Sequence, residues 1–129
     1  MATRSRSRVA PAKEDVLPAE IDATADLLPD LLIETRRQMN AAINADDLER
    51  ARTLRLQAAA IANALQLFLR REIKAIDDGA EMKRLIAQLS AINADIRTII
   101  SAAQQAAQFL KQLTAITAGL NTVAGKLLK

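Results

Sequence analysis

The sequence predicts an all-α protein: a long antiparallel helical hairpin or a three-helix bundle with coiled-coil-like packing, preceded by a disordered N-terminal tail. Half of the 129 residues are hydrophobic, mostly Ala and Leu, whereas Gly and Pro number three each and Phe only two. That balance favours helices over sheets. Apolar residues also recur at helical spacing over most of the chain, and the last third alternates them in regular steps of four and three.

The residue types present leave little for catalysis. The chain contains no Cys, His, Trp or Tyr. Ser90 and Ser101 therefore have no histidine to activate them. The acidic groups at 46–49 and 77–81 lack the ligand spacing of a calcium loop and are interpreted as helix caps. We expect no catalytic residue, no cofactor and no metal site, and hence a protein that is not an enzyme.

Charge is segregated along the chain. Residues 1–13 carry four positive charges, residues 14–34 carry seven negative charges, and residues 35–129 are net +6, for a total of +3. The N-terminus lacks the apolar core of a secretory signal. No uncharged run reaches the roughly 18 apolar residues of a membrane-spanning helix. We expect a cytoplasmic protein.

The expected domain organisation is a tail over residues 1–17 and one helical domain over residues 18–129. Its helices are predicted at about 29–44, 46–77 and 80–124. The tail mixes Arg, Ser, Pro and Lys without an apolar period, which is typical of disorder.

Two prolines lie near the expected start of the first helix. Pro18 suits the first position of a short helix, whereas Pro29 is expected to break or restart it. Beyond Pro29, a stripe of Leu32, Met39 and Ile43 predicts the buried face.

The middle helix follows a junction. Asp46 and Glu49 resemble a capping box, but without a Gly or Pro nearby a continuous, kinked helix stays open as an alternative. The predicted buried stripe comprises Ala51, Leu54, Ala58, Ile61, Leu65, Phe68 and Ile76. On the opposite face lie four basic residues that form a candidate anion-contacting face: Arg52, Arg55, Arg70 and Lys74.

A sharp reversal is predicted at residues 76–83. Gly79 can take the left-handed conformation that ends a helix, and Asp78 with Glu81 can cap the next helix.

The last predicted helix carries a coiled-coil-like seam. The positions in steps of four and three, with neighbours that widen the face, include the candidate assembly residues, here called the seam residues: Leu85, Leu89, Ile92, Ile96, Ile99, Phe109, Leu110, Leu113, Ile116, Leu120 and Val123. A face this wide predicts contact with more than one helix.

The stretch from 98 to 125 holds a single charged residue, Lys111. A turn at Gly79 would place residues near 46 opposite residues near 111. The rest of the last helix would then project past its partner by roughly 20 Å and would need a cover. The preceding helix 29–44, a second copy or a partner helix could supply it.

The main hypothesis is therefore a non-enzymatic helical interaction module that forms a homo-oligomer or binds a helical protein partner through the seam residues. The first alternative is a membrane-active component that inserts residues 98–125, because small residues there would allow close helix contact in a bilayer. A weaker alternative is a nucleic-acid accessory protein that uses the basic face, although aromatic stacking platforms are missing.

Overall fold

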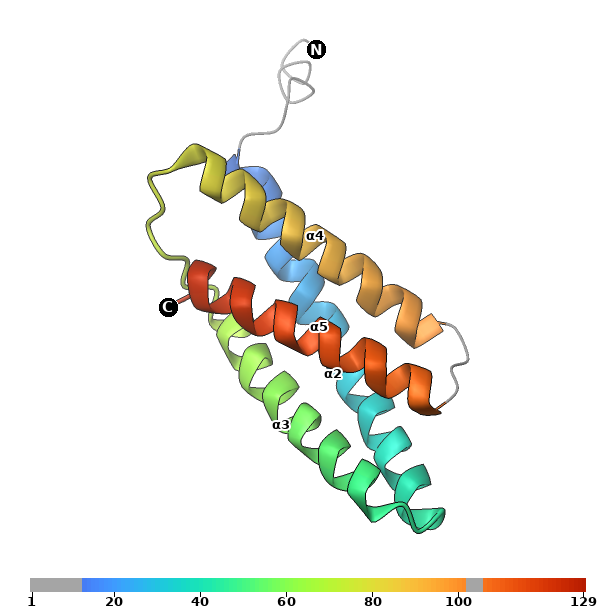
Figure 1. Cartoon of the computed structure of the whole chain (residues 1–129). Coiled ribbons are helices and arrows are strands. Elements are labelled where there is room, and N and C mark those ends of the chain that lie inside the picture. Colours follow the sequence, from blue (N-terminus) through green and yellow to red (C-terminus); the bar gives the residue numbers. More distant parts are fainter. Residues whose placement is uncertain (1–12, 102–105) are drawn as a thin grey trace.

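The computed structural model describes residues 13–101 and 106–129, and they form an all-helical bundle, as predicted. Figure 1 shows its four helices, which are α2 (Lys13–Asn44), α3 (Leu48–Arg70), α4 (Gly79–Ser101) and α5 (Ala106–Leu127). The prediction of three helices is thus wrong, because the last predicted helix is two.

The four helices form two hairpins that pack side by side. Helices α2 and α3 make one hairpin and α4 and α5 the other; α2 also packs on α4, and α3 on α5. In Figure 1, α2 and α4 run in one direction and α3 and α5 in the opposite direction. Each helix therefore has two neighbours, which leaves one long side of each exposed.

Helix α2 begins at Lys13 rather than at Pro29, and it continues through both Pro18 and Pro29. Both prolines are exposed, so neither ring takes the place of a core side chain. Leu17 and Leu31, on either side, are buried in the same core. Tertiary packing thus overrides the local preference for a break. Of the predicted tail, residues 13–17 belong to α2, and residues 1–12 lie outside the described residues.

The buried stripe of α2 also differs from the prediction. Leu32 and Met39 are only partly buried, and Ile43 is 49% exposed. The residues that fill the core are instead Leu17, Ile21, Ala25, Leu28, Leu31 and Ala42. Helix α2 starts earlier than expected, and most of its buried residues lie in its first half. The stripe predicted from the second half lies next to this buried face.

A true turn separates α2 from α3, so the continuous, kinked helix is ruled out. Asp46 has a left-handed φ of 61°. Asp47, one residue after the predicted cap, is the N-cap, and its carboxylate accepts a hydrogen bond from the N–H of Arg50 at 3.2 Å. An Asp tolerates the left-handed region better than most residues, which is why no glycine is needed here.

Helix α3 ends at Arg70, earlier than the predicted residue 77. Arg71 takes a left-handed φ of 57°, and its N–H donates to the carbonyl of Leu67 at 3.3 Å. The role predicted for Gly79 is therefore wrong: Gly79 opens α4, and no glycine in the described ranges has a positive φ.

The residues after Arg71 leave the helix to pair with the other end of the chain. The N–H of Lys74 donates to the carbonyl of Leu127 at 2.8 Å, and the N–H of Lys129 donates to the carbonyl of Glu72 at 2.8 Å. These bonds flank an isolated antiparallel bridge between Ile73 and Leu128. A pairing with residues this far along the chain is invisible to helical periodicity.

The predicted cap of the next helix is confirmed at Asp78. Its carboxylate accepts hydrogen bonds from the N–H groups of Ala80 at 2.9 Å and Glu81 at 3.3 Å. Glu81 itself pairs with Arg84 one turn later.

The single helix predicted over residues 80–124 is replaced by α4 and α5, which are antiparallel neighbours. The link between them, 102–105, lies outside the described residues. Residues after Lys111 consequently run alongside α3 instead of projecting past it, and the predicted overhang is absent. Lys111 still lies opposite Asp47 and Glu49 across a surface hollow, as its predicted position near residue 46 required.

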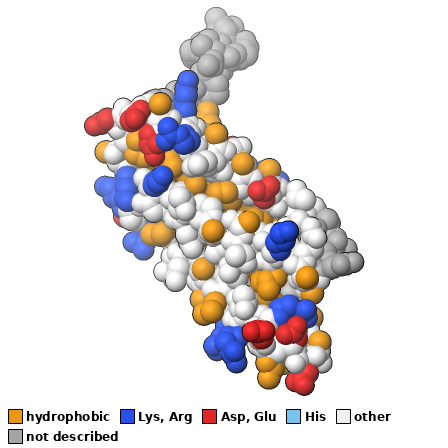
Figure 2. All heavy atoms as spheres, viewed as in Figure 1, with side chains coloured by type: hydrophobic (Ala, Val, Ile, Leu, Met, Phe, Trp, Pro, Cys, Tyr) orange, Lys and Arg blue, Asp and Glu red, His pale blue; other side chains and the backbone are white. Residues whose placement is uncertain are grey.

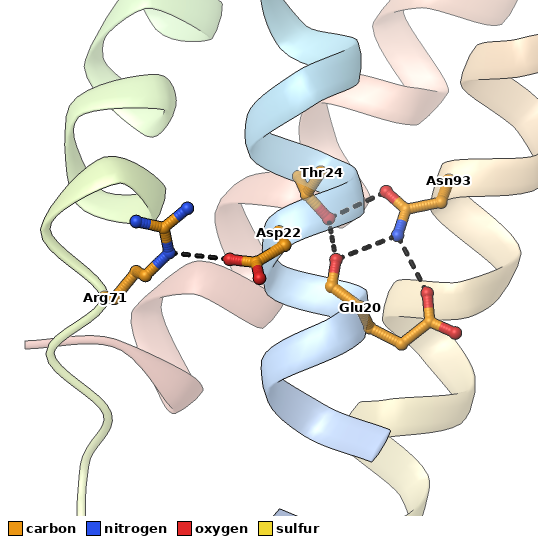
Figure 3. Close-up of polar contacts among 5 residues, drawn as sticks. All are labelled: Glu20, Asp22, Thr24, Arg71 and Asn93. Carbon is orange, nitrogen blue, oxygen red and sulfur yellow. Dashed lines mark hydrogen bonds and ion pairs between the residues drawn. The ribbon is translucent and has the colours of Figure 1, made fainter. Parts of the chain in front are cut away.

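One polar cluster lies between α2 and α4 (Figure 3). The side-chain amide of Asn93, which is fully buried, donates to the carboxylate of Glu20 at 3.0 Å and to its main-chain carbonyl at 3.2 Å. The hydroxyl of Thr24 lies 2.7 Å from the amide oxygen of Asn93 and 2.9 Å from the carbonyl of Glu20. Buried amides need such partners, so the cluster ties α2 and α4 to one register.

Candidate helix-binding surface

The seam residues lie inside the bundle. Ten of the eleven are buried and Leu110 is half-buried. They join apolar residues of α2 and α3 in one core cluster. While the bundle is closed, most of the surface of these side chains is covered by their own chain, although Ile92, Ile116 and Val123 also line surface hollows.

One polar side chain, that of Thr117, is buried among the seam residues of α5. Thr117 is 5% exposed, and its hydroxyl donates to the carbonyl of Leu113 in the same helix at 2.8 Å. A buried threonine satisfied by its own helix needs no partner from outside.

The solvent side of α5 is poor in charge. Between Ala106 and Gly125 its only charged residue is Lys111. The other exposed positions of this segment are Ala107, Gln108, Thr114, Ala115, Ala118, Asn121, Thr122 and Gly125. In Figure 2 the middle of the molecule shows few red or blue side chains, and most of them gather toward its two ends.

Two hollows lie between α4 and α5 on this side. The first, of about 260 Å³, is lined by Ile92, Asp95 and Thr98 of α4 and by Gln112, Ala115 and Ile116 of α5. The second, of about 360 Å³, is lined by Gln88, Ala91, Ile92, Ala118, Gly119, Thr122 and Val123. Small side chains on both helices leave these hollows, and Asp95 is the only charged residue that lines them. We call the exposed residues of α5 together with these hollows the α4–α5 face.

Gly125 has no role inside the chain that a larger residue could not fill. It lies in α5 without a left-handed backbone, and a Cβ added to it would meet nothing within 4 Å. A glycine inside a helix is less favourable than alanine by about 1 kcal/mol.

The candidate anion-contacting face is only partly assembled. Arg52, Arg55 and Arg70 are exposed on α3, but Arg70 is 15 residues, about 22 Å, from Arg55 along the helix. Lys74 is in the connection to α4, where its ammonium donates to the carbonyl of Gly125 at 2.6 Å. The structure therefore brings Arg52 and Arg55 together and places Arg70 and Lys74 apart from that pair.

Sequence reasoning missed the exposed apolar side chains. The five large ones are all on the α2–α3 hairpin: Ile33 (58%), Ile43 (49%), Leu48 (55%), Leu56 (64%) and Leu69 (54%). Leu48, Leu56 and Leu69 are not members of the buried stripe that the sequence predicts for α3. Their position off that stripe could have identified them as exposed.

No protein-family model, curated protein or solved structure matches this chain. In the described part of the chain, no group of three or more acidic residues gathers as a metal site would require. Nor does any described helix have the length and apolar character needed to cross a membrane.

Proposed function

We propose that this protein is a non-enzymatic helical interaction module that binds a helix, from a second copy or from a partner protein, on the α4–α5 face. The observation that carries the proposal is the scarcity of charge on the exposed side of α5. Surface helices of soluble proteins normally place charged residues opposite their buried stripe, and here Lys111 alone does so between residues 106 and 125.

The shape of the face supports the same proposal. Ala115, Ala118 and Gly119 lie next to hollows between α4 and α5. Small residues at this spacing allow another helix to approach closely, and a helix side chain would fit into a hollow of about 260 Å³ or about 360 Å³. In this proposal the seam residues hold α4 against α5 and so shape the face, while the face itself makes the contact.

Light scattering tests the proposal on purified protein over a range of concentrations. The unaltered chain should exceed its monomer mass of 14.0 kDa. The double variant Ala115→Arg with Ala118→Arg places two long charged side chains on the face and should return the mass to that of the monomer in about 0.5 M salt, where contacts between exposed charges are screened. Both positions are exposed, so circular dichroism should show unchanged helicity.

Ala94→Arg is the matched control, because Ala94 is an exposed alanine of α4 that lines neither hollow. It should leave the mass unchanged. If the unaltered chain is monomeric at every concentration, self-association is wrong, and the face must be tested against added amphipathic helices.

A further inference from the structure

The exposed side of α2 carries a short stripe of acid followed by one large apolar residue. Asp26, Asp30 and Ile33 are spaced four and three residues apart and are all exposed, Ile33 at 58%. This spacing places them on one side of the helix. Neither aspartate belongs to an ion pair within residues 13–101 and 106–129.

The exposed side of α3 carries the opposite pattern. Leu48, Arg52 and Arg55 are also spaced four and three residues apart and are all exposed, Leu48 at 55%. Residues 50–71 contain five arginines and no acidic residue. Within the part of the chain that the structure describes, Arg52 and Arg55 form no ion pair.

The two stripes match in length when the helices run antiparallel. Ile33 lies seven residues after Asp26, and Leu48 lies seven residues before Arg55. Both intervals correspond to about 10.5 Å along a helix. With Ile33 opposite Leu48, Asp26 falls opposite Arg55, and Asp30 falls within one residue of the position opposite Arg52.

The match continues past the apolar pair. Arg36, three residues after Ile33 and exposed, falls opposite the segment just before Leu48, where Asp46 is exposed. Glu34 and Asp47 also face one another in this register, but each already pairs with an arginine of its own chain, Arg37 and Arg50.

We propose that α2 of one copy docks antiparallel on α3 of a second copy, through these two charge-complementary stripes. The contact uses α2 and α3 and does not depend on the α4–α5 face. It joins two different surfaces of the same chain, so in a pair one copy keeps its α3 stripe unused and the other keeps its α2 stripe unused. Such a head-to-tail contact extends into longer assemblies as concentration rises, unless rotation closes a ring.

The chemistry of the α3 stripe favours a second copy over a nucleic acid. Leu48 and Leu56 are each more than half exposed beside the arginines, and phosphates offer no apolar surface to cover them. The acidic stripe of α2 would repel a polyanion, whereas it attracts the arginines of another copy.

Charge reversal tests the contact in a chain that also carries Ala115→Arg and Ala118→Arg, so that the α4–α5 face is blocked. One variant adds Asp26→Lys with Asp30→Lys, and the other adds Arg52→Glu with Arg55→Glu. Each alone should fall to the 14.0 kDa monomer in light scattering, because its two stripes then carry the same sign. All four sites are exposed, and unchanged circular dichroism establishes that each variant is folded.

Mixing the two variants in equal amounts should restore the assembly, because each stripe again meets its opposite. Combining all four changes in one chain should restore it too. Raising the salt from about 0.05 M to about 0.5 M should dissociate the assembly, because the Debye length shortens severalfold. Arg97→Glu, an exposed charge reversal on α4, is the control and should change nothing.

A blocked chain that is monomeric at low salt overturns the proposal, and so do single variants that keep their mass or a mixture that fails to reassemble. Binding of a DNA duplex by the blocked chain, without self-association, would assign the arginines to phosphate contact instead. Because every chain in the test already lacks a functional α4–α5 face, these outcomes leave the proposed function to its own experiment.

Discussion

Asn93 is the fully buried amide that joins α4 to α2, and its three polar contacts make it the most sensitive polar residue of the core. Asn93→Ala would leave the Glu20 side chain and one contact of the Thr24 hydroxyl without their partner. We expect the free energy of unfolding to fall by about 1–3 kcal/mol, because the variant loses the hydrogen bonds of a buried amide, one of them to a carboxylate. Urea denaturation measures it.

Asn121→Ala is the control for this change, because Asn121 is an exposed asparagine of α5. Its effect should stay within about 0.5 kcal/mol. Equal effects of the two substitutions would show that the contacts of Asn93 add nothing to stability.

Arg71 is a second residue with a specific backbone role, since it ends α3 with a φ of 57°. Arg71→Ala and Arg71→Gly both remove its 2.6 Å contact with Asp22, which joins two half-exposed side chains. The variants therefore differ mainly in backbone strain. Because glycine enters the left-handed region freely, Arg71→Gly should be more stable than Arg71→Ala by about 1 kcal/mol.

Thermal melts of the two variants decide this prediction. Inside a regular helix alanine is the more stable of the pair, so the reverse order would show that residue 71 continues the helix in solution.

At the scale of elements, the sequence predicted which residues form apolar stripes, but it did not predict where the chain reverses direction. The four-and-three pattern from Leu85 to Leu120 is continuous, and α4 and α5 do bury it on both sides of the reversal. Nothing in the 98–105 segment is a strong breaker such as Pro or Gly. A periodic pattern that is equally compatible with one long helix and with two short ones cannot decide between them.

Of the predicted caps, Asp78 is confirmed, whereas the N-cap of α3 is Asp47 in place of Asp46 and Gly79 does not end a helix. Asp78 acts as predicted because an N-cap depends only on the next few residues. The end of α3 depends on bonds from residues 72 and 74 to residues 127 and 129, and no local signal contains them.

The burial of the seam residues changes what substitutions there should do. Leu89 of α4 and Leu113 of α5 are both fully buried in one core. Leu89→Ala and Leu113→Ala should each lower the free energy of unfolding by about 2–5 kcal/mol. Leu110→Ala should lower it less, because Leu110 is only half-buried.

Chemical denaturation measures the stability of these variants, and light scattering on the same samples measures their self-association. A Leu113→Ala variant that keeps its full stability but loses self-association would show that the seam residues themselves form the interface, as the sequence alone suggested.

At the scale of the whole molecule, the candidate surface could be predicted only in part. The low charge of residues 98–125 is visible in the sequence, and it does mark the exposed side of α5. The residues that stay exposed are set by the packing of four described helices, each of which has two neighbours. That arrangement depends on the antiparallel packing of α4 and α5. The acidic and basic stripes lie on separate helices for the same reason.

The closed bundle also bears on the membrane-active alternative, which stays a prediction. Each described helix places its large buried apolar residues in the common core, so lipid can reach them only after the hairpins separate. Vesicle binding should therefore track the population of opened molecules.

The unaltered protein should release little dye from anionic vesicles, and Leu113→Ala should release more because it lowers the free energy of opening. Asn121→Ala, which leaves the core intact, should behave as the unaltered protein does. Strong release by the unaltered chain, unaffected by Leu113→Ala, would mean that an exposed surface of the closed bundle, and not its core, meets the lipid.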